Sequence, residues 1–273
     1  MAAGDVTVDT LTPISFPCAK FDGVDDYVSF PDLDLFSFGN GTIDFPFSIT
    51  AWVKTTSALA TNQVILGKYQ SPFEYYFHLR GTDTLPQLEI RDQSAAVNCA
   101  CSGTTGAVVN IWVHVAATYN GVGGATAGNG IKIYTNGLNV TGTPSNNAAY
   151  VAMENGTSIS KIGLRSTPNT QPFKGFIRDV RIYNRVLSSS EITRVSNSEL
   201  ITDGLIGHWK LDGDADDSSG NGNNGTDSGN IYLADNETID SEFTTARVNA
   251  NSKYYAIPLK ASNSVMTVHI EEA

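Results

Sequence analysis

The sequence predicts an all-β protein, an antiparallel β-sandwich or jelly roll with one short helix. Three observations support this prediction. Short stretches with period-two hydrophobic alternation recur along the chain, and turn-forming residues separate them. No such stretch alternates with a long helical pattern, which excludes a nucleotide-binding α/β fold. The 25 glycines and a charged fraction of only 16% favour strands and turns over helices.

The first two thirds of the chain supply most of the predicted strands. Residues 19–30 have the pattern of two short strands joined by a tight turn, because Gly23, Asp25 and Asp26 are turn formers. Asn136-Gly137 is a two-residue hairpin signal, and residues 120–130 predict a flexible loop. Further strands are predicted at residues 47–54, 64–68, 75–80, 87–92, 95–101, 112–119, 131–135, 138–141 and 159–164.

Residues 174–183 predict a longer strand that we expect to form an edge of the sandwich. Under period-two alternation Phe176, Val180 and Ile182 share one face of this strand. Ile177 and Asp179 share the other face. Half-buried strands have this alternation, so one of the two faces is expected to line the core.

The one predicted helix follows this strand. A serine at position 188, 189 or 190 can cap it, with Glu191 in its first turn and Ile192 and Val195 facing inward. Residues 205–211 predict another strand, and a loop rich in Asp, Asn, Ser and Gly follows it. Two final strands are predicted at 253–259 and 264–270. The predicted organisation is an N-terminal arm (1–17), a sandwich (18–226) and a C-terminal extension (227–273).

Charge and composition exclude several partners. The formal net charge is −11 and no basic face is evident, so we expect no nucleic-acid partner and no binding to an anionic membrane. No apolar run is long enough for membrane insertion. The first seventeen residues lack the basic start and apolar stretch of a secretory signal, so export by that route is not expected. Cys18, Cys99 and Cys101 predict small buried thiols and no disulfide framework or zinc site.

Five motifs together resemble one family. They are FDGVDDYVSF at 21–30, FSITAWVK at 47–54, WVHVAATYNG at 112–121, KIYTNG at 132–137 and GFIRDVRIYNRVLSSSEI at 175–192. As an ordered set they resemble the laminin G-like, concanavalin A-like lectin/glucanase jelly-roll family over residues 18–226.

The order of the motifs departs from that family in one respect. A segment like residues 204–226, GLIGHWKLDGDADDSSGNGNNGT, usually precedes the FDG motif, whereas here it follows the IRDVRIYN strand. Two alternatives follow. Either the sandwich is circularly permuted and this segment folds back beside residues 21–30, or the segment completes a neighbouring chain's sandwich by strand exchange.

The resemblance implies a structural Ca²⁺ ion. Its carboxylate ligand would be Asp217, with Asn221 and Asn223 adding oxygens and Asp22 and Asp179 closing the shell. Position 178 departs from the family, which commonly has an acidic residue where this chain has arginine.

The resemblance also implies glycan binding, for which aromatic side chains are the candidates. Tyr69, Phe73, Tyr75 and Tyr76 gather around Ser71-Pro72 and could form a sugar platform. Trp52 or Trp112 are alternatives, and core packing of all these rings is equally compatible with the sequence.

Catalysis is not expected. Glycosidases of this fold class need two carboxylates across a groove, and in an acid-x-acid strand these share one face. The nearest run places Glu237 opposite Asp240 and Glu242, and Glu89 and Asp92 also fall on opposite faces. The four histidines, 78, 114, 208 and 269, are predicted to be sheet residues.

The sequence therefore predicts a non-enzymatic structural or adhesive surface protein of a virus particle. A bacteriophage capsid decoration, fibre or tail component is the preferred form, because such domains are frequent in phage structural proteins. Its expected partners are copies of itself, other virion proteins or cell-surface glycans. The alternative is a carbohydrate-binding module of a bacterial surface or secreted protein, located outside the cell. A glycoside hydrolase or lyase is the third hypothesis.

Overall fold

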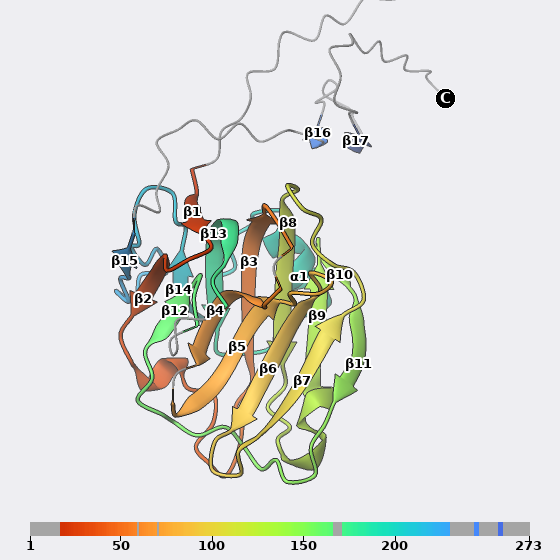
Figure 1. Ribbon diagram of the computed structural model, residues 1–273, viewed down its shortest axis with the longest axis vertical. Coiled ribbons are helices and arrows are strands. Elements are labelled where there is room, and N and C mark those ends of the chain that lie inside the picture. Colours follow the sequence, from red (N-terminus) through yellow and green to blue (C-terminus); the bar gives the residue numbers. More distant parts are fainter. Residues whose placement is uncertain are drawn as a thin grey trace, which may run out of the picture. The chain divides into compact units, whose positions relative to one another are not determined.

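Two antiparallel sheets packed face to face make up the sandwich (Figure 1). The computed structural model describes residues 17–58, 60–69, 71–165, 171–229, 243–245 and 256–258. The predicted N-terminal arm before Pro17 and the strand predicted at 264–270 lie outside the described residues. The antiparallel sandwich that the sequence predicts is confirmed.

The two sheets are named here by their strand number. The seven-stranded sheet has the order β1 (Ala19–Asp22), β13 (Lys174–Tyr183), β3 (Phe47–Thr55), β8 (Val113–Tyr119), β9 (Ile131–Thr135), β10 (Leu138–Asn139), and β14 (Leu205–Trp209) also pairs with β13. The eight-stranded sheet has the order β11 (Thr141–Ser145), β7 (Val97–Gly103), β6 (Pro86–Asp92), β5 (Phe73–Leu79), β4 (Gln63–Tyr69), β12 (Ser160–Ile162), β2 (Tyr27–Phe30), β15 (Thr226–Ser228).

The central core lies between the sheets. Alternate residues of each strand face it, as period-two patterning requires. The fully buried side chains include Phe47 and Ile49 of β3, Phe77 of β5, and Leu88 and Ile90 of β6. Cys99 and Cys101 join this core and Cys18 is also buried, which agrees with the predicted buried thiols.

Strand β13 lies inside its sheet, so the prediction that it forms an edge is wrong. One side of β13 pairs with β3. On its other side β1 pairs with Lys174–Ile177 and β14 pairs with Val180–Tyr183, so these two strands lie end to end. The segment Gly204–Thr226 thus packs within its own chain, and β15 pairs with β2 beyond it.

A β-bulge in β13 changes which residues face the core. The register against β3 shifts between Arg178 and Arg181, and Asp179 has a φ of 53°. Ile177 and Val180 are therefore both in the core, whereas Phe176 is outside it. Strict alternation had placed Phe176 and Val180 on one face, and the extra residue of the bulge is the reason for the difference.

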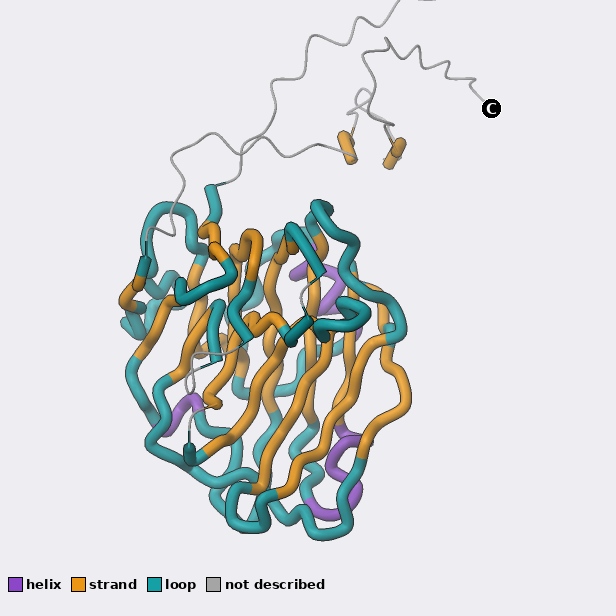
Figure 2. Tube along the Cα trace, viewed as in Figure 1, coloured by secondary structure: helices purple, strands orange, loops and turns teal. Residues whose placement is uncertain are grey.

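Helix α1 (Ser189–Ser196) covers part of the outer face of the seven-stranded sheet. Ser188 caps it in a capping box with Glu191, as one of the predicted alternatives states. Ile192 and Val195 are buried, and they belong to a second cluster with Ala116 and Tyr183 of the sheet. The other helical segments of the described residues are the 3-10 helices η1 (Asp34–Phe36) and η2 (Gly124–Gly130) (Figure 2).

The loop predicted to be flexible at residues 120–130 is instead structured. η2 consists of two short turns that meet at Thr126, and Ala127 is fully buried in the core. A separate unit contains the two-stranded sheet of β16 (Phe243–Thr245) and β17 (Ala256–Pro258). Among the described residues, no helix has the length and apolar character needed to cross a membrane.

Candidate functional site

The outer face of the eight-stranded sheet carries a row of side chains that points away from the core. Lys161, Gly67, Tyr76, Glu89 and Ala100 lie directly opposite one another on five neighbouring strands. Residues opposite one another in antiparallel strands share a face, and the neighbours of Tyr76 in β5 face the core. The row therefore lies on the outer face, with small residues on either side of Tyr76 and Glu89.

Three aromatic rings gather on this row. We call Tyr69, Phe73 and Tyr76 the aromatic platform. The ring of Tyr69 lies 4.7 Å from that of Phe73 and 4.2 Å from that of Tyr76, measured between centroids. The His78 ring continues the platform, stacked on Tyr76 at 4.3 Å with 14° between the planes. Burial lowers the pKa of His78 to about 3, so this ring is neutral at pH 7.

Glu89 connects the two tyrosines of the platform. Its carboxylate accepts hydrogen bonds from the hydroxyl of Tyr69 at 2.8 Å and from that of Tyr76 at 3.3 Å. Burial raises the pKa of both tyrosines well above the usual value, and the charge of Glu89 adds to the effect. Both hydroxyls thus remain protonated donors, and Glu89 is held in one orientation.

Cationic side chains lie over the platform. The guanidinium of Arg165 is 4.6 Å from the centroid of the Tyr69 ring and 5.5 Å from that of Phe73. The guanidinium of Arg91 is 5.3 Å from the Phe73 centroid. These distances are typical of cation–π contacts, which favour arginine over an aromatic face.

Exposure decides which groups a ligand can touch. Tyr69 and Tyr76 are each only 5% exposed and form the floor of the platform. Phe73, Glu89, Arg91 and Arg165 are half-buried and are open to a ligand. The accessible part of the site is therefore the Phe73 ring with the guanidinium groups of Arg91 and Arg165 over it.

The structure places three of the four predicted aromatic candidates together and separates the fourth. Tyr75 is fully buried in the core, and its hydroxyl donates to the carbonyl of Phe36 at 3.0 Å. Adjacent strand residues point to opposite faces, so Tyr75 cannot share a face with Tyr76. The sequence prediction missed the contribution of Glu89, Arg91 and Arg165. The outward alternation of β6 could have indicated the first two, whereas no local signal indicates Arg165.

The alternative aromatic candidates lie on the outer face of the other sheet. Trp52 and Trp112 are both half-buried there. Arg178 lies near both rings, 5.4 Å from the Trp52 centroid and 5.2 Å from the Trp112 centroid. Neither tryptophan belongs to the core between the sheets.

The predicted calcium ligands do not come together. Asp179 binds Arg181 in a bidentate ion pair at 2.7 and 2.8 Å. It also accepts a hydrogen bond from His208 Nε2 at 2.7 Å. Burial would raise the pKa of Asp179, but the hydrogen bond from His208 and the charge of Arg181 outweigh it and lower this pKa to about 2. This carboxylate therefore already has its cationic partner.

Asp217 and the two predicted asparagines form a self-contained loop. The Asp217 carboxylate accepts the backbone N–H groups of His208, Ser219 and Asn223. The side-chain amides of Asn221 and Asn223 both donate to the carbonyl of Ile206. These contacts attach the loop to β14, and both oxygens of the Asp217 carboxylate accept backbone N–H groups in them.

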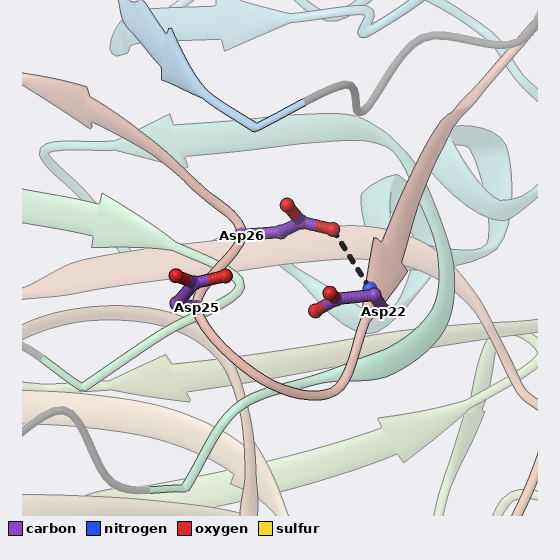
Figure 3. Close-up of side chains that lie close together, drawn as sticks. All are labelled: Asp22, Asp25 and Asp26. Atoms are coloured by element: carbon purple, nitrogen blue, oxygen red, sulfur yellow. Dashed lines mark hydrogen bonds between the residues drawn. The ribbon is translucent and has the colours of Figure 1, made fainter.

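Asp22 lies in a different group of carboxylates. With Asp25 and Asp26 it occupies the turn between β1 and β2, where the three acidic groups have ligand atoms within 4.8 Å of one another (Figure 3). The backbone N–H of Asp22 donates to Asp26 at 2.9 Å. In the described part of the chain this is the only such group of three, so the structure does not group Asp22 with Asp179 and Asp217.

The acidic residues considered for catalysis are also separate. Glu89 belongs to the platform, whereas Asp92 is buried and accepts the backbone N–H groups of Ala95 and Val151. His78, His114 and His208 lie in strands, as predicted. The run at 237–242 and His269 lie outside the described residues.

Comparisons with known proteins bear on the fold. A family model described as the concanavalin A-like lectin/glucanases superfamily matches residues 22–193. A proposed carbohydrate-binding protein from Bacteroides ovatus ATCC 8483 is 18% identical with a TM-score of 0.53, covering 81% of this chain and 62% of that chain. The heptameric SAP-like pentraxin of Limulus polyphemus is 12% identical with a TM-score of 0.55, covering 84% of this chain and 100% of that chain. No curated protein sequence matches.

Proposed function

Because the chain belongs to the concanavalin A-like lectin/glucanases superfamily, we propose that it is a non-enzymatic carbohydrate-binding protein. Its sugar site is the outer face of the eight-stranded sheet, at the aromatic platform. The carbohydrate binding proposed for the structural neighbour from Bacteroides ovatus agrees with this function.

The proposal rests on one observation. Aromatic rings and polar side chains lie together on the outer face of the eight-stranded sheet. A pyranose ring has an apolar C–H face and a rim of hydroxyls, so it needs an aromatic surface with hydrogen-bonding groups beside it. Phe73 offers the accessible ring, and Tyr69 beneath it fixes its position at 4.7 Å. Glu89 supplies an acceptor beside the platform's tyrosines, and Arg91 and Arg165 supply donors over the Phe73 ring.

The same geometry supports a binding role without catalysis. Glycosidases use a pair of carboxyl groups about 5–10 Å apart across the scissile bond. Among the described residues only one carboxylate, that of Glu89, contacts the platform. Its two oxygens accept hydrogen bonds from two tyrosine hydroxyls. Among the described residues the platform therefore lacks the second carboxyl group that a general acid and a general base would require.

A glycan array probed with the full chain tests the proposal. The wild type and a Phe45→Ala control, which removes an exposed phenylalanine of a loop, should bind the same glycans. Phe73→Ala should lower the affinity about tenfold, a loss of about 1.4 kcal/mol. Binding that Phe73→Ala leaves intact and Trp112→Ala removes would move the site to the other sheet. A folded wild type that binds no glycan would overturn the proposal.

We also propose a virus particle as the setting of this binding, as the family resemblance indicates. A phage decoration, fibre or tail protein would use the platform to attach to surface glycans. The carbohydrate-binding module of a bacterial surface or secreted protein fits the same platform equally well. Co-sedimentation with purified particles, together with the solution mass, separates the two. A monomer that binds glycans and does not associate with particles would favour the module.

Calcium stays a proposal that rests on the family resemblance. Of the five predicted ligands, Asp179 contacts Arg181 and His208, and Asp217 accepts the backbone N–H of His208. If an ion is bound and linked to folding, chelation should lower the melting temperature by several degrees. An unchanged melting temperature in excess chelator would remove calcium from the proposal.

A further inference from the structure

We propose that the aromatic platform selects sugars that carry an anionic group, a carboxylate or a sulfate. This inference rests on the proposed function and names the class of ligand. It follows from the charges on the outer face of the eight-stranded sheet, which differ in sign from the charge of the whole chain.

Three cations lie on this face beside one carboxylate. Arg91 and Arg165 lie over Phe73, and Lys161 stands in the same cross-strand row as Tyr76 and Glu89. Among the described residues none of these three cations forms an ion pair. The chain as a whole has a formal charge of −11. The face therefore has a local excess of positive charge that attracts anions.

Two buried cations of this chain are paired with carboxylates inside the fold. Lys68 is fully buried and contacts Glu74 and Asp32, each at 2.7 Å. Arg181 is 3% exposed and has its bidentate partner in Asp179. An unpaired charge that is partly buried costs free energy unless a partner arrives. The half-buried Arg165, without a carboxylate, therefore differs from the structural cations of the same chain.

Donor groups remain available on the two arginines. Arg165 Nε is buried and has no hydrogen-bond partner among the residues that the structure describes. Arg91 uses its Nε in a hydrogen bond of 3.3 Å to Gln93, which leaves its terminal amino groups. A guanidinium presents its donors as a planar fork that matches a carboxylate or a sulfate. Among the described residues Glu89 forms no ion pair with either arginine, and its two oxygens accept the hydroxyls of Tyr69 and Tyr76.

The arrangement fits a sugar ring on Phe73 with its anionic group toward a guanidinium. Arg165 and Arg91 lie 5.5 and 5.3 Å from the same ring centroid. Both guanidinium groups lie over the Phe73 ring, so a pyranose that binds against the exposed part of this ring has its anionic substituent within reach of them. Neutral sugars would gain the stacking but would leave the guanidinium groups unpaired, so their affinity should be lower.

Titration calorimetry on the full chain tests this inference. The probes are a neutral polysaccharide, a polyuronate and a sulfated polysaccharide, each at low and high salt. We expect the acidic probes to bind about tenfold more tightly than the neutral one, with the difference shrinking in high salt. If substitution of the arginines weakens binding of the polyuronate, the recognised group is a carboxylate. If it weakens binding of the sulfated polysaccharide, the recognised group is a sulfate.

Matched variants complete the test. Arg165→Gln and Arg91→Gln should each lower acidic-glycan affinity about tenfold, whereas Lys132→Gln removes an exposed charge from β9 of the other sheet and should change it less than twofold. Arg165→Lys keeps the positive charge but lacks the planar pair of guanidinium donors. Weaker binding by a folded Arg165→Lys variant would therefore report on recognition of the anionic group and not on a folding defect. Equal binding of neutral and acidic probes by wild type and variants would overturn this inference and leave the proposed function intact. Binding of no probe would overturn both.

Discussion

The indole of Trp209 stacks on the phenyl ring of Phe30, with 4.1 Å between centroids and 20° between planes. Trp209 ends β14 of the seven-stranded sheet, and Phe30 ends β2 of the eight-stranded sheet. The indole N–H also donates to the carbonyl of Asn223 at 3.1 Å. This contact therefore joins the two sheets and fixes the loop that follows β14.

Trp209→Ala should strongly destabilise the sandwich. The side chain is fully buried, and truncation leaves a large cavity in the core and a carbonyl without its donor. We expect the free energy of unfolding to fall by about 3–5 kcal/mol, measured by urea unfolding. Trp112→Ala, which truncates a half-buried tryptophan outside the core, is the matched control and should cost less. Equal losses in both variants would contradict the central position of Trp209.

Gly67→Ala should disturb the aromatic platform. A Cβ atom at position 67 would lie 2.7 Å from the Cβ of Tyr76, which is too close without movement of the strand. We expect a loss of about 1–3 kcal/mol of stability from this overpacking, together with weaker glycan binding. The control is Ala100→Gly, which lies in the same cross-strand row as Gly67. Another glycine such as Gly41 is unsuitable, because its φ of 80° would itself strain an alanine. Unchanged binding by Gly67→Ala would show that Tyr76 has no role.

The buried His78 should make the protein less stable in mild acid. Burial lowers its folded-state pKa from 6.5 to about 3. Between these two values the unfolded chain binds a proton that the folded chain does not, so stability falls as the pH drops through this window. His78→Phe keeps a flat ring on Tyr76 and should reduce the fall between pH 6.5 and 4.5. Urea unfolding at both pH values measures it, and an identical fall in both proteins would refute the assignment.

Asp179 should contribute stability that disappears at lower pH. Its pKa is lowered from 3.8 to about 2 in the folded state, where the His208 hydrogen bond and the Arg181 charge overcome the cost of burial. The contribution is complete above about pH 4 and is lost as the pH falls toward 2. Asp179→Asn should cost about 3–5 kcal/mol at pH 7, since it leaves the buried Arg181 without a carboxylate. Its melting temperature should also depend less on pH between 4 and 2, and a wild-type slope in the variant would contradict this.

Much of the fold follows from local patterns. Alternation locates the strands from Phe47–Thr55 to Val113–Tyr119, and turn residues locate the hairpin at Asn136-Gly137. Ser188 and Glu191 form the capping box that their spacing allows. These features depend on neighbours in the sequence, so the sequence alone can predict them.

Features set by distant contacts could not be predicted in this way. The bulge at Asp179 reverses the inward and outward alternation along β13. The Asp179 side chain contacts Arg181 and His208, and His208 reaches it only when β14 pairs with β13. The short β15 has no apolar pattern and forms because β2 offers it an edge. The site shows the same limit. Tyr69, Phe73 and Tyr76 are close in sequence, whereas Arg165 reaches them from beyond β12.

The placement of β14 and β15 has a consequence for how the chain folds during synthesis. β1 finds its partner in β13, and β2 finds its partners in β12 and β15. The first two strands therefore leave the ribosome long before their partners, with roughly 200 residues between β2 and β15, a delay on the order of 10–40 s at about 5–20 residues per second. The meander from β4 to β7 pairs locally and can form first. Until the last strands emerge, the N-terminal strands are the part of the nascent chain most exposed to aggregation.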